Sequence, residues 1–269
     1  MDNPHRDVLL SGSALEDPGV RLKVLALRLG RGRTGGSTFL DLLIQLARAA
    51  GRNVLVCDGD RRNPTLATLY PPGTPGGATQ PPSDEVPDGK EWLTDSISEA
   101  VRTASSLVFD MGGGDRTVQD YVREMDLAEL CTAIDRLSLG LFFCGPDMDD
   151  FDHIVSIWRA GYFRPTRSLL VFNEHLVPQG RTAFGAFDAI MARPEFLELV
   201  DGGMEMIMLP RLPCLEVMRQ AGLGFVDAAA GRPGIKGVPL DPVRQFMVKQ
   251  WIAKVLANLE RVGATGWMP

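Results

Sequence analysis

Apolar residues occur along this chain in short, nearly continuous runs, separated by stretches in which they recur at helical spacing. Continuous runs of this kind are typical of strands buried on both faces of a parallel sheet. They predict strands at residues 24–29, 52–58, 105–110, 139–144, 168–172 and 204–209. Helical patterns fill the intervals, so strands and helices alternate. This alternation predicts an α/β fold of three layers, in which helices flank a mainly parallel sheet.

The helical patterns differ in how completely they are apolar. A wide apolar stripe over residues 37–50 predicts a helix buried against the sheet, and further helices are predicted at 91–103 and 117–136. The helix predicted at 241–261 is amphipathic, with Val243, Phe246, Met247, Trp251, Val255 and Leu259 on one stripe. Such a helix either lies on a membrane surface or docks on its own sheet, and we expect docking.

The domain organisation follows from where these patterns stop. We expect a flexible tail over residues 1–20, a single domain over 21–262 and a short tail over 263–269. Residues 71–90 are rich in proline and glycine and show no periodic pattern, which predicts a mobile loop without regular structure. This loop is either a lid over a ligand or a tolerated surface insertion.

Composition narrows the class of protein. A net charge of −6 gives no overall basic field for nucleic acid, although it leaves room for a local basic patch. The four cysteines lie far apart in sequence and are expected to be buried reduced thiols. The N-terminal residues lack a signal-peptide pattern, and no apolar run approaches the ~20 residues that span a bilayer. We therefore expect a cytoplasmic protein.

A glycine-rich stretch between the first strand and the first helix is the leading candidate for chemistry. Gly30, Gly32, Gly35 and Gly36 precede Ser37 and Thr38, which open the helix. Free N–H groups at a helix N-terminus and the helix dipole favour an anion there, and glycine lets the backbone approach a phosphate. The spacing is that of the phosphate-binding loop G-x-x-x-x-G-K-[ST], but Gly36 stands at the lysine position. The alternative is an ordinary glycine-rich turn without a ligand.

Aspartates follow two other predicted strands. Asp58 and Asp60 end the second strand, and Asp110, followed by three glycines, ends the third. The carboxyl ends of parallel strands form the ligand-binding edge of an α/β sheet. A carboxylate beside a phosphate loop is suited to hold Mg²⁺, and mobile glycines are suited to sense a phosphate. An acidic run at residues 147–152 is instead expected to stabilise a helix N-terminus through its dipole.

Taken in order, these strand-end features resemble the ParA/MinD family of deviant P-loop ATPases, which act in plasmid partition, mobilisation and division-site placement. The family loop K-G-G-x-G-K-[ST]-[ST] is matched by residues 31–38, its D-x-D by 58–60 and its D-x-x-G by 110–113. Asn173 and Pro210 match an asparagine and a proline that follow later strands. The resemblance covers roughly residues 22–260.

The resemblance implies a role for each matching residue and implies ATP and Mg²⁺ as cofactors. Ser37 and Asp110 would hold the metal with Asp58 in its outer shell, Asp60 would position the attacking water, and Gly113 or Gly114 would sense the γ-phosphate. Asn173 would hydrogen-bond adenine, and Pro210 would belong to the same cofactor-binding site. Arg31 stands where the family places a lysine that reaches across a nucleotide-sandwich homodimer, and Arg33 is a second candidate cation. The implied partners are a plasmid partition or mobilisation protein, or DNA.

The loss of the loop lysine leaves two hypotheses. In the first, the protein is an ATP-dependent switch that hydrolyses slowly and uses Arg31 or Arg33 in place of lysine. In the second, it is a pseudo-ATPase scaffold that binds a partner protein or DNA without turnover. Removing such a charge can lower a rate by roughly 10²–10³. We therefore expect hydrolysis to be weak or absent.

Overall fold

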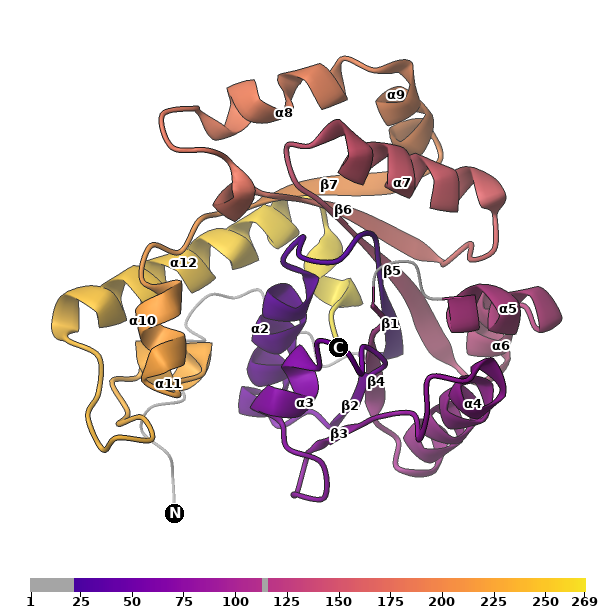
Figure 1. The fold of residues 1–269 in the computed structure, drawn as a ribbon, viewed down its shortest axis with the longest axis horizontal. Coiled ribbons are helices and arrows are strands. Elements are labelled where there is room, and N and C mark those ends of the chain that lie inside the picture. Colours follow the sequence, from indigo (N-terminus) through magenta and orange to yellow (C-terminus); the bar gives the residue numbers. More distant parts are fainter. Residues whose placement is uncertain (1–21, 113–115) are drawn as a thin grey trace.

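The computed structural model describes residues 22–112 and 116–269, and it has three layers (Figure 1). Seven strands of these residues form one sheet in which every pairing is parallel. The strands are β1 (Lys23–Leu29), β2 (Val54–Asp58), β3 (Ala78–Thr79), β4 (Ser106–Asp110), β5 (Arg136–Cys144), β6 (Arg167–Asn173) and β7 (Met204–Leu209). The predicted α/β class and three-layer arrangement are confirmed, and the sheet is entirely rather than mainly parallel.

The strand order, β3-β2-β4-β1-β5-β6-β7, places β1 near the centre of the sheet. The chain first adds β2, β3 and β4 on one side of β1, with β4 inserted between β2 and β1, and then adds β5 to β7 in order on the other side. The carboxyl end of β1 is therefore the point where the direction of winding reverses. Open α/β sheets bind ligands in the crevice outside the strands at such a point.

Helices cover both faces of the sheet, and alternate strand residues point to one face or the other. One face is covered by α2 (Gly36–Ala49), α3 (Thr65–Leu69), α10 (Leu215–Gln220), α11 (Phe225–Ala229) and α12 (Pro242–Arg261). The opposite face is covered by α4 (Val86–Arg102), α5 (Arg116–Glu124), α6 (Leu127–Ala133), α7 (Met148–Ala160), α8 (Ala183–Met191) and α9 (Pro194–Asp201). In β1, Val24 and Ala26 pack on the first face and Leu25 and Leu27 on the second.

The prediction of one continuous helix over residues 117–136 is wrong, because the chain forms two helices there, α5 and α6. The first helix ends at Glu124, and Asp126 caps the second, its carboxylate accepting hydrogen bonds from the N–H groups of Ala128 and Glu129, each at 2.9 Å. Residue 136 already belongs to β5. A side-chain N-cap of this kind favours a new helix start.

Two segments expected to be irregular contain regular structure. Residues 71–90 include the short strand β3 and the first residues of α4. Residues 263–269 include the 3₁₀ turn η3 (Ala264–Trp267), and Ala264 and Met268 are buried in the core on the α12 side of the sheet. The chain therefore remains packed to its last described residues.

The terminal helix α12 docks on the sheet, as expected, but with a different stripe. Val248 and Ile252 are buried together with the predicted Trp251, Val255 and Leu259. Val243, Phe246 and Met247, in its first two turns, are exposed. In residues 22–112 and 116–269, no helix combines the length and apolar character needed to cross a membrane.

Candidate functional site

The glycine-rich loop lies between β1 and α2, at the centre of the carboxyl edge of the sheet. Gly35 immediately precedes α2 with a φ of 90°, a left-handed conformation that favours glycine. The helix has no side-chain N-cap and no acidic residue in its first turn. The N–H groups at its start therefore remain available to an anion, and the helix dipole adds to their attraction.

A large open pocket of about 950 Å³ surrounds this loop. The residues that line it include every predicted loop residue except Gly30, namely Arg31, Gly32, Arg33, Gly35, Gly36, Ser37 and Thr38, together with Asp60 from the end of β2. Arg28, Pro146, Asp147, Asp150 and Leu176 complete the walls along with Thr34, Asn63 and Thr65. Residues predicted from separate strand ends are thus brought to one site.

The predicted aspartates gather beside the loop. Asp58 and Asp110 occupy paired positions on the neighbouring strands β2 and β4. The Asp58 carboxylate accepts hydrogen bonds from the N–H groups of Asp60 at 3.1 Å and Ala67 at 2.8 Å. Burial, reinforced by the charge of Asp110, raises the pKa of Asp58 to about 6 despite these bonds. Asp58 thus positions the turn after β2, and its oxygens are already engaged.

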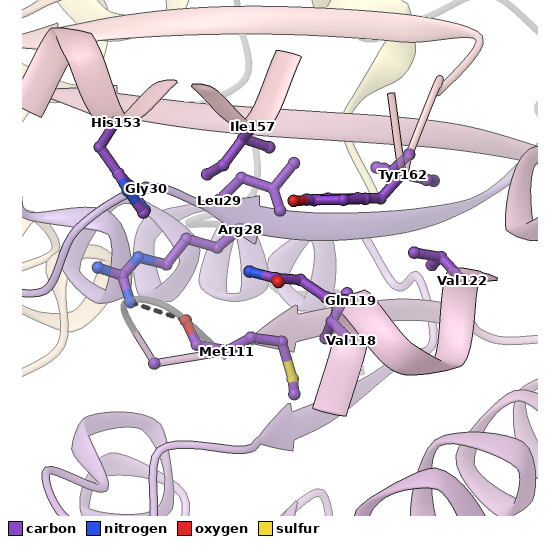
Figure 2. Close-up of a pocket in the computed structure, with 12 residues that line it drawn as sticks. Arg28, Leu29, Gly30, Met111, Val118, Gln119, Val122, His153, Ile157 and Tyr162 are labelled. Carbon is purple, nitrogen blue, oxygen red and sulfur yellow. Dashed lines mark hydrogen bonds between the residues drawn. The ribbon is translucent and has the colours of Figure 1, made fainter. Parts of the chain in front are cut away.

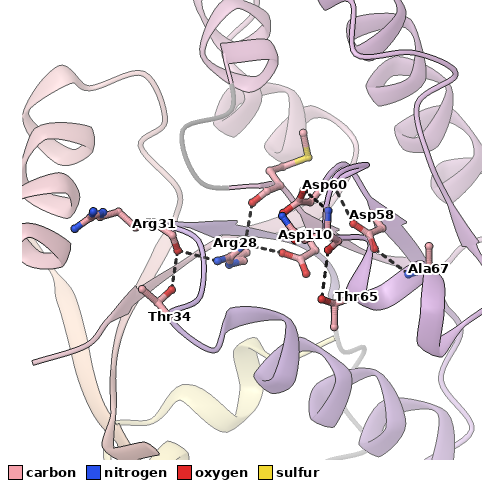
Figure 3. A network of polar contacts seen from close by, with 10 residues as sticks. Arg28, Arg31, Thr34, Asp58, Asp60, Thr65, Ala67 and Asp110 are labelled. Carbon is pink, nitrogen blue, oxygen red and sulfur yellow. Dashed lines mark hydrogen bonds and ion pairs between the residues drawn. The ribbon is translucent and has the colours of Figure 1, made fainter. Parts of the chain in front are cut away.

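Arg28 is the residue of the site that the sequence pattern did not reveal. It lies in β1, two residues before Gly30, and its side chain is only 4% exposed. Its guanidinium makes an ion pair with Asp110, Nη1 to Oδ1 at 3.0 Å, and donates to the carbonyl oxygens of Met111 at 3.1 Å and Arg31 at 2.9 Å (Figures 2 and 3). A lone arginine within an apolar strand was the available signal, because a buried cation requires a carboxylate partner.

The Arg28 side chain also explains the glycine at position 36. A Cβ atom on Gly36 would lie 2.1 Å from Arg28 Nε and 2.6 Å from Arg28 Cδ. No side chain fits there while Arg28 keeps its position, so the lysine of a standard phosphate loop is sterically excluded. Burial raises the pKa of Asp110, while the Arg28 charge and the Ser37 hydroxyl act to lower it.

The two arginines predicted to replace the lysine lie elsewhere. The Arg31 side chain points away from Arg28 (Figure 3). It pairs with Asp149 at 3.6 Å and Asp150 at 3.4 Å, at the start of α7. Arg33 is exposed at the loop tip with a φ of 65°. Within the described residues no ion pair holds Arg33. Arg33 is therefore free to turn toward the pocket, whereas Arg31 is occupied.

Asn173 and Pro210, predicted to take part in cofactor binding, do not line the pocket. Asn173, at the end of β6, is 4% exposed; it donates from Nδ2 to the Thr34 carbonyl at 2.9 Å and accepts from the His175 N–H at 3.0 Å. Its amide thus supports the loop instead of facing the pocket. Pro210 follows β7 and accepts a hydrogen bond from Trp251 at 2.6 Å, and it does not line the pocket. Gly113 and Gly114 lie outside the described residues.

The site suits a phosphate group better than a divalent metal ion. The helix N-terminus and the open cradle favour an anion, and so does the buried Nε of Arg28, which has no hydrogen-bond partner in the part of the chain that the structure describes. Mg²⁺ requires free oxygen ligands, but the Asp110 carboxylate is bound to a guanidinium.

Comparison with known proteins adds little beyond the general architecture. No protein-family model and no curated protein matches the sequence. The cell division protein MinD of Aquifex aeolicus is 13% identical over 87% of this chain and 97% of its own, with a TM-score of 0.45. The signal recognition particle receptor FtsY of Elizabethkingia anophelis is 14% identical over 91% of this chain and 71% of its own, also at 0.45. At these values neither likeness bears on activity, and the fold class rests on the sheet order and the loop.

Proposed function

We propose that this protein binds a nucleotide through its phosphate groups, in the pocket around residues 30–38, and turns it over slowly or not at all. The observation that carries the proposal is the glycine loop at the carboxyl edge of the central strand, opening an uncapped helix into a pocket of about 950 Å³. ATP is the expected nucleotide because of the resemblance to the ParA/MinD family.

The arrangement of charges supports binding with weak catalysis. The arginines that line the pocket, at positions 28, 31 and 33, are balanced by aspartates 60, 147 and 150. Backbone N–H groups therefore supply much of the attraction for phosphate. Asp60 lines the pocket, yet its Oδ1 already accepts from the Asn63 N–H at 3.0 Å. Neither a loop lysine nor an unpaired Arg31 is present to stabilise the charge of the transition state. This favours a switch or a scaffold over an efficient enzyme.

Binding is tested by calorimetric titration of the protein with ATP, ADP and GTP. The pair Gly32→Glu and Gly32→Gln isolates charge, because a Cβ on Gly32 meets nothing within 4 Å and this residue lines the pocket. We expect Gly32→Glu to bind at least about tenfold more weakly than Gly32→Gln, because its carboxylate repels phosphate. Gly266→Glu, equally unhindered and outside the pocket, is expected to bind like the native protein. No binding by the native protein, or equal binding by both Gly32 variants, would contradict the proposal.

The biological setting is proposed on the resemblance alone. A role in plasmid partition, maintenance or mobilisation would make the protein a homodimer or place it with a partner protein or DNA. Analytical ultracentrifugation with and without ATP tests nucleotide-dependent dimerisation.

The alternative function, a pseudo-ATPase scaffold, is favoured by the ion pair of Arg28 with Asp110, and it predicts no phosphate release above the rate in buffer.

A further inference from the structure

The buried ion pair in β1 and β4 lies directly beneath the phosphate loop and is not explained by nucleotide binding of the usual kind. Arg28 and Asp110 are 4% and 2% exposed, and the guanidinium lies against the first residue of α2. Its Nη atoms donate to the Asp110 carboxylate, to the Met111 carbonyl after β4 and to the Arg31 carbonyl in the phosphate loop. Its Nε has no hydrogen-bond partner among the described residues.

We propose that Arg28 supplies from β1 the positive charge that a phosphate-loop lysine supplies from the helix, and that its pairing with Asp110 lets the loop hold nucleotide phosphates without a divalent metal ion. This inference rests on the proposed function. It assigns the role to a residue for which the family pattern provides no counterpart.

Three spatial facts favour this exchange of position. The Cβ of any residue at 36 would overlap Arg28 Nε and Cδ, so arginine at 28 and glycine at 36 are matched to each other. Arg28 lines the pocket together with Gly35, Gly36, Ser37 and Thr38, so the cation borders the cradle without filling it. A buried N–H without a partner costs free energy, and a phosphate oxygen is an acceptor of the right charge.

The space on the other side of the Arg28 guanidinium is poorly suited to a charged group. On its far side lies a cavity of about 40 Å³, bounded largely by apolar side chains such as Val118, Val122 and Ile157 (Figure 2). That volume holds only a few water molecules, and none of the described residues that line it carries a carboxylate. Arg28 is therefore held at the floor of the phosphate pocket by its pairing with Asp110.

The same placement disfavours Mg²⁺. A metal ion bound by Ser37 and Asp110 would share the carboxylate with the guanidinium, and the two cations would repel each other at close range in a buried site. The guanidinium instead neutralises Asp110 and keeps that charge from repelling the phosphates. One arginine thereby takes over two electrostatic tasks.

The first test needs only the native protein, titrated calorimetrically with ADP and with ATP in Mg²⁺ and again in excess EDTA. We expect the affinities in the two buffers to differ by less than about tenfold. A loss of tenfold or more in EDTA would overturn the inference and leave the proposed function intact. Failure to bind in either buffer would overturn both.

The second test is a double-mutant cycle over positions 28 and 36. Arg28→Ala is expected to bind ADP about 10–100-fold more weakly, the effect of losing a hydrogen bond from a charged group. Gly36→Lys alone is expected to bind weakly, because the introduced lysine and Arg28 compete for one space. In Arg28→Ala/Gly36→Lys the cation has space on the helix, and we expect binding to recover at least tenfold over Arg28→Ala.

Two results of the cycle would contradict the inference. One is an Arg28→Ala variant that binds like the native protein, and the other is a double variant that binds no better than Arg28→Ala. Far-ultraviolet circular dichroism and size-exclusion chromatography establish that each variant is folded. If Arg28→Ala fails to fold, the EDTA comparison on the native protein still decides the matter.

Discussion

At the scale of single residues, the backbone of Arg33 carries strain at the tip of the phosphate loop. Its φ of 65° is left-handed, a conformation that costs a residue with a Cβ roughly 1–2 kcal/mol. The side chain is exposed and lines the pocket, so it gains little from packing. We infer that the Arg33 charge contributes to phosphate binding, because the side chain gains little from packing and its backbone is strained.

We predict that Arg33→Gly raises the free energy of unfolding by up to about 1 kcal/mol, because strain relief exceeds the entropy that glycine adds to the unfolded chain. The same variant should bind ATP up to about tenfold more weakly, since one charge leaves the pocket. Arg33→Ala is the control: it loses the charge and keeps the strain, so it should weaken binding without stabilising the fold. Denaturant titration and calorimetry measure the two effects. Equal stability of the glycine and alanine variants would contradict the strained conformation.

The sequence predicted most of the site residues at this scale and missed the most important cation. Glycine spacing located the loop, and carboxylates at strand ends located Asp58, Asp60 and Asp110. The role of Arg28 was not predicted, because the apolar pattern of residues 24–29 indicates a buried strand but does not show which residue pairs with a charge inside that strand. That partner, Asp110, is 82 positions away in sequence and is brought close only by the pairing of β1 with β4. Asn173 was predicted as a site residue, but its hydrogen bonds to Thr34 and His175 could not be predicted from the sequence.

At the scale of elements, α2 is held in place by a buried carboxylate in its second turn. Asp41 is 1% exposed and accepts hydrogen bonds from Arg219 in α10 at 2.5 Å, Gln45 at 2.7 Å and Tyr70 at 2.5 Å. Burial and the nearby Asp41 charge raise the pKa of Tyr70 above its usual value, so the phenol keeps its proton and donates. The helix that presents the phosphate loop is thereby tied to α10 and to the end of α3.

We predict that Asp41→Ala lowers the free energy of unfolding by an amount near the lower end of about 3–5 kcal/mol, because it strands the donors of a buried ion pair while Arg219 keeps some access to water. Asp41→Asn should cost less, since its amide oxygen still accepts. Arg102→Ala, which breaks the exposed Arg102–Glu99 pair of α4, should change stability little. Chemical denaturation followed by circular dichroism compares the three. A loss for Asp41→Ala no larger than for Arg102→Ala would argue against the buried network.

Strands were more predictable than helix boundaries, for a physical reason. Strands buried on both faces are apolar throughout, whereas a helix boundary depends on one capping side chain. Asp126 and Glu129 form such a signal within residues 117–136, and it was hidden by the apolar positions on either side. In α12, periodicity alone grouped Phe246 with Trp251, although Phe246 is exposed and the buried positions of the helix begin at Val248.

At the scale of the whole molecule, one continuous sheet connects both core layers. Hydrogen bonding runs from β3 to β7 without interruption, and the apolar residues of the two faces pack against opposite sides of the same strands. The parallel class could be predicted from the alternation of elements. The strand order could not, because the sequence alone does not say on which side of β1 each new strand is added. That order is what brings Asp110 next to Arg28.

The four cysteines report on whether this molecule unfolds as one unit, as the prediction of a single domain requires. All are buried and free, and they are distributed over both faces of the sheet: Cys214 on the α12 side, Cys57 and Cys131 under α4 to α6, and Cys144 under α7. Burial raises the pKa of Cys57 and of Cys131 to about 11. Because the thiolate is the reactive species, a thiol reagent at pH 8 should label the native protein very slowly.

We predict that all four cysteines become reactive at the same denaturant concentration, because separating the layers exposes the shared strands to water on both faces. Pulse labelling with iodoacetamide across a urea series, read out for each cysteine by mass spectrometry, measures the four midpoints. The native protein without urea serves as the unreactive control, and the fully denatured protein should label at all four sites. Earlier labelling of Cys144 than of the other three would instead divide the molecule between β1 and β5, the boundary at which the phosphate loop is built. Nucleotide binding would then depend on the docking of two units, and ATP should raise the Cys144 midpoint alone.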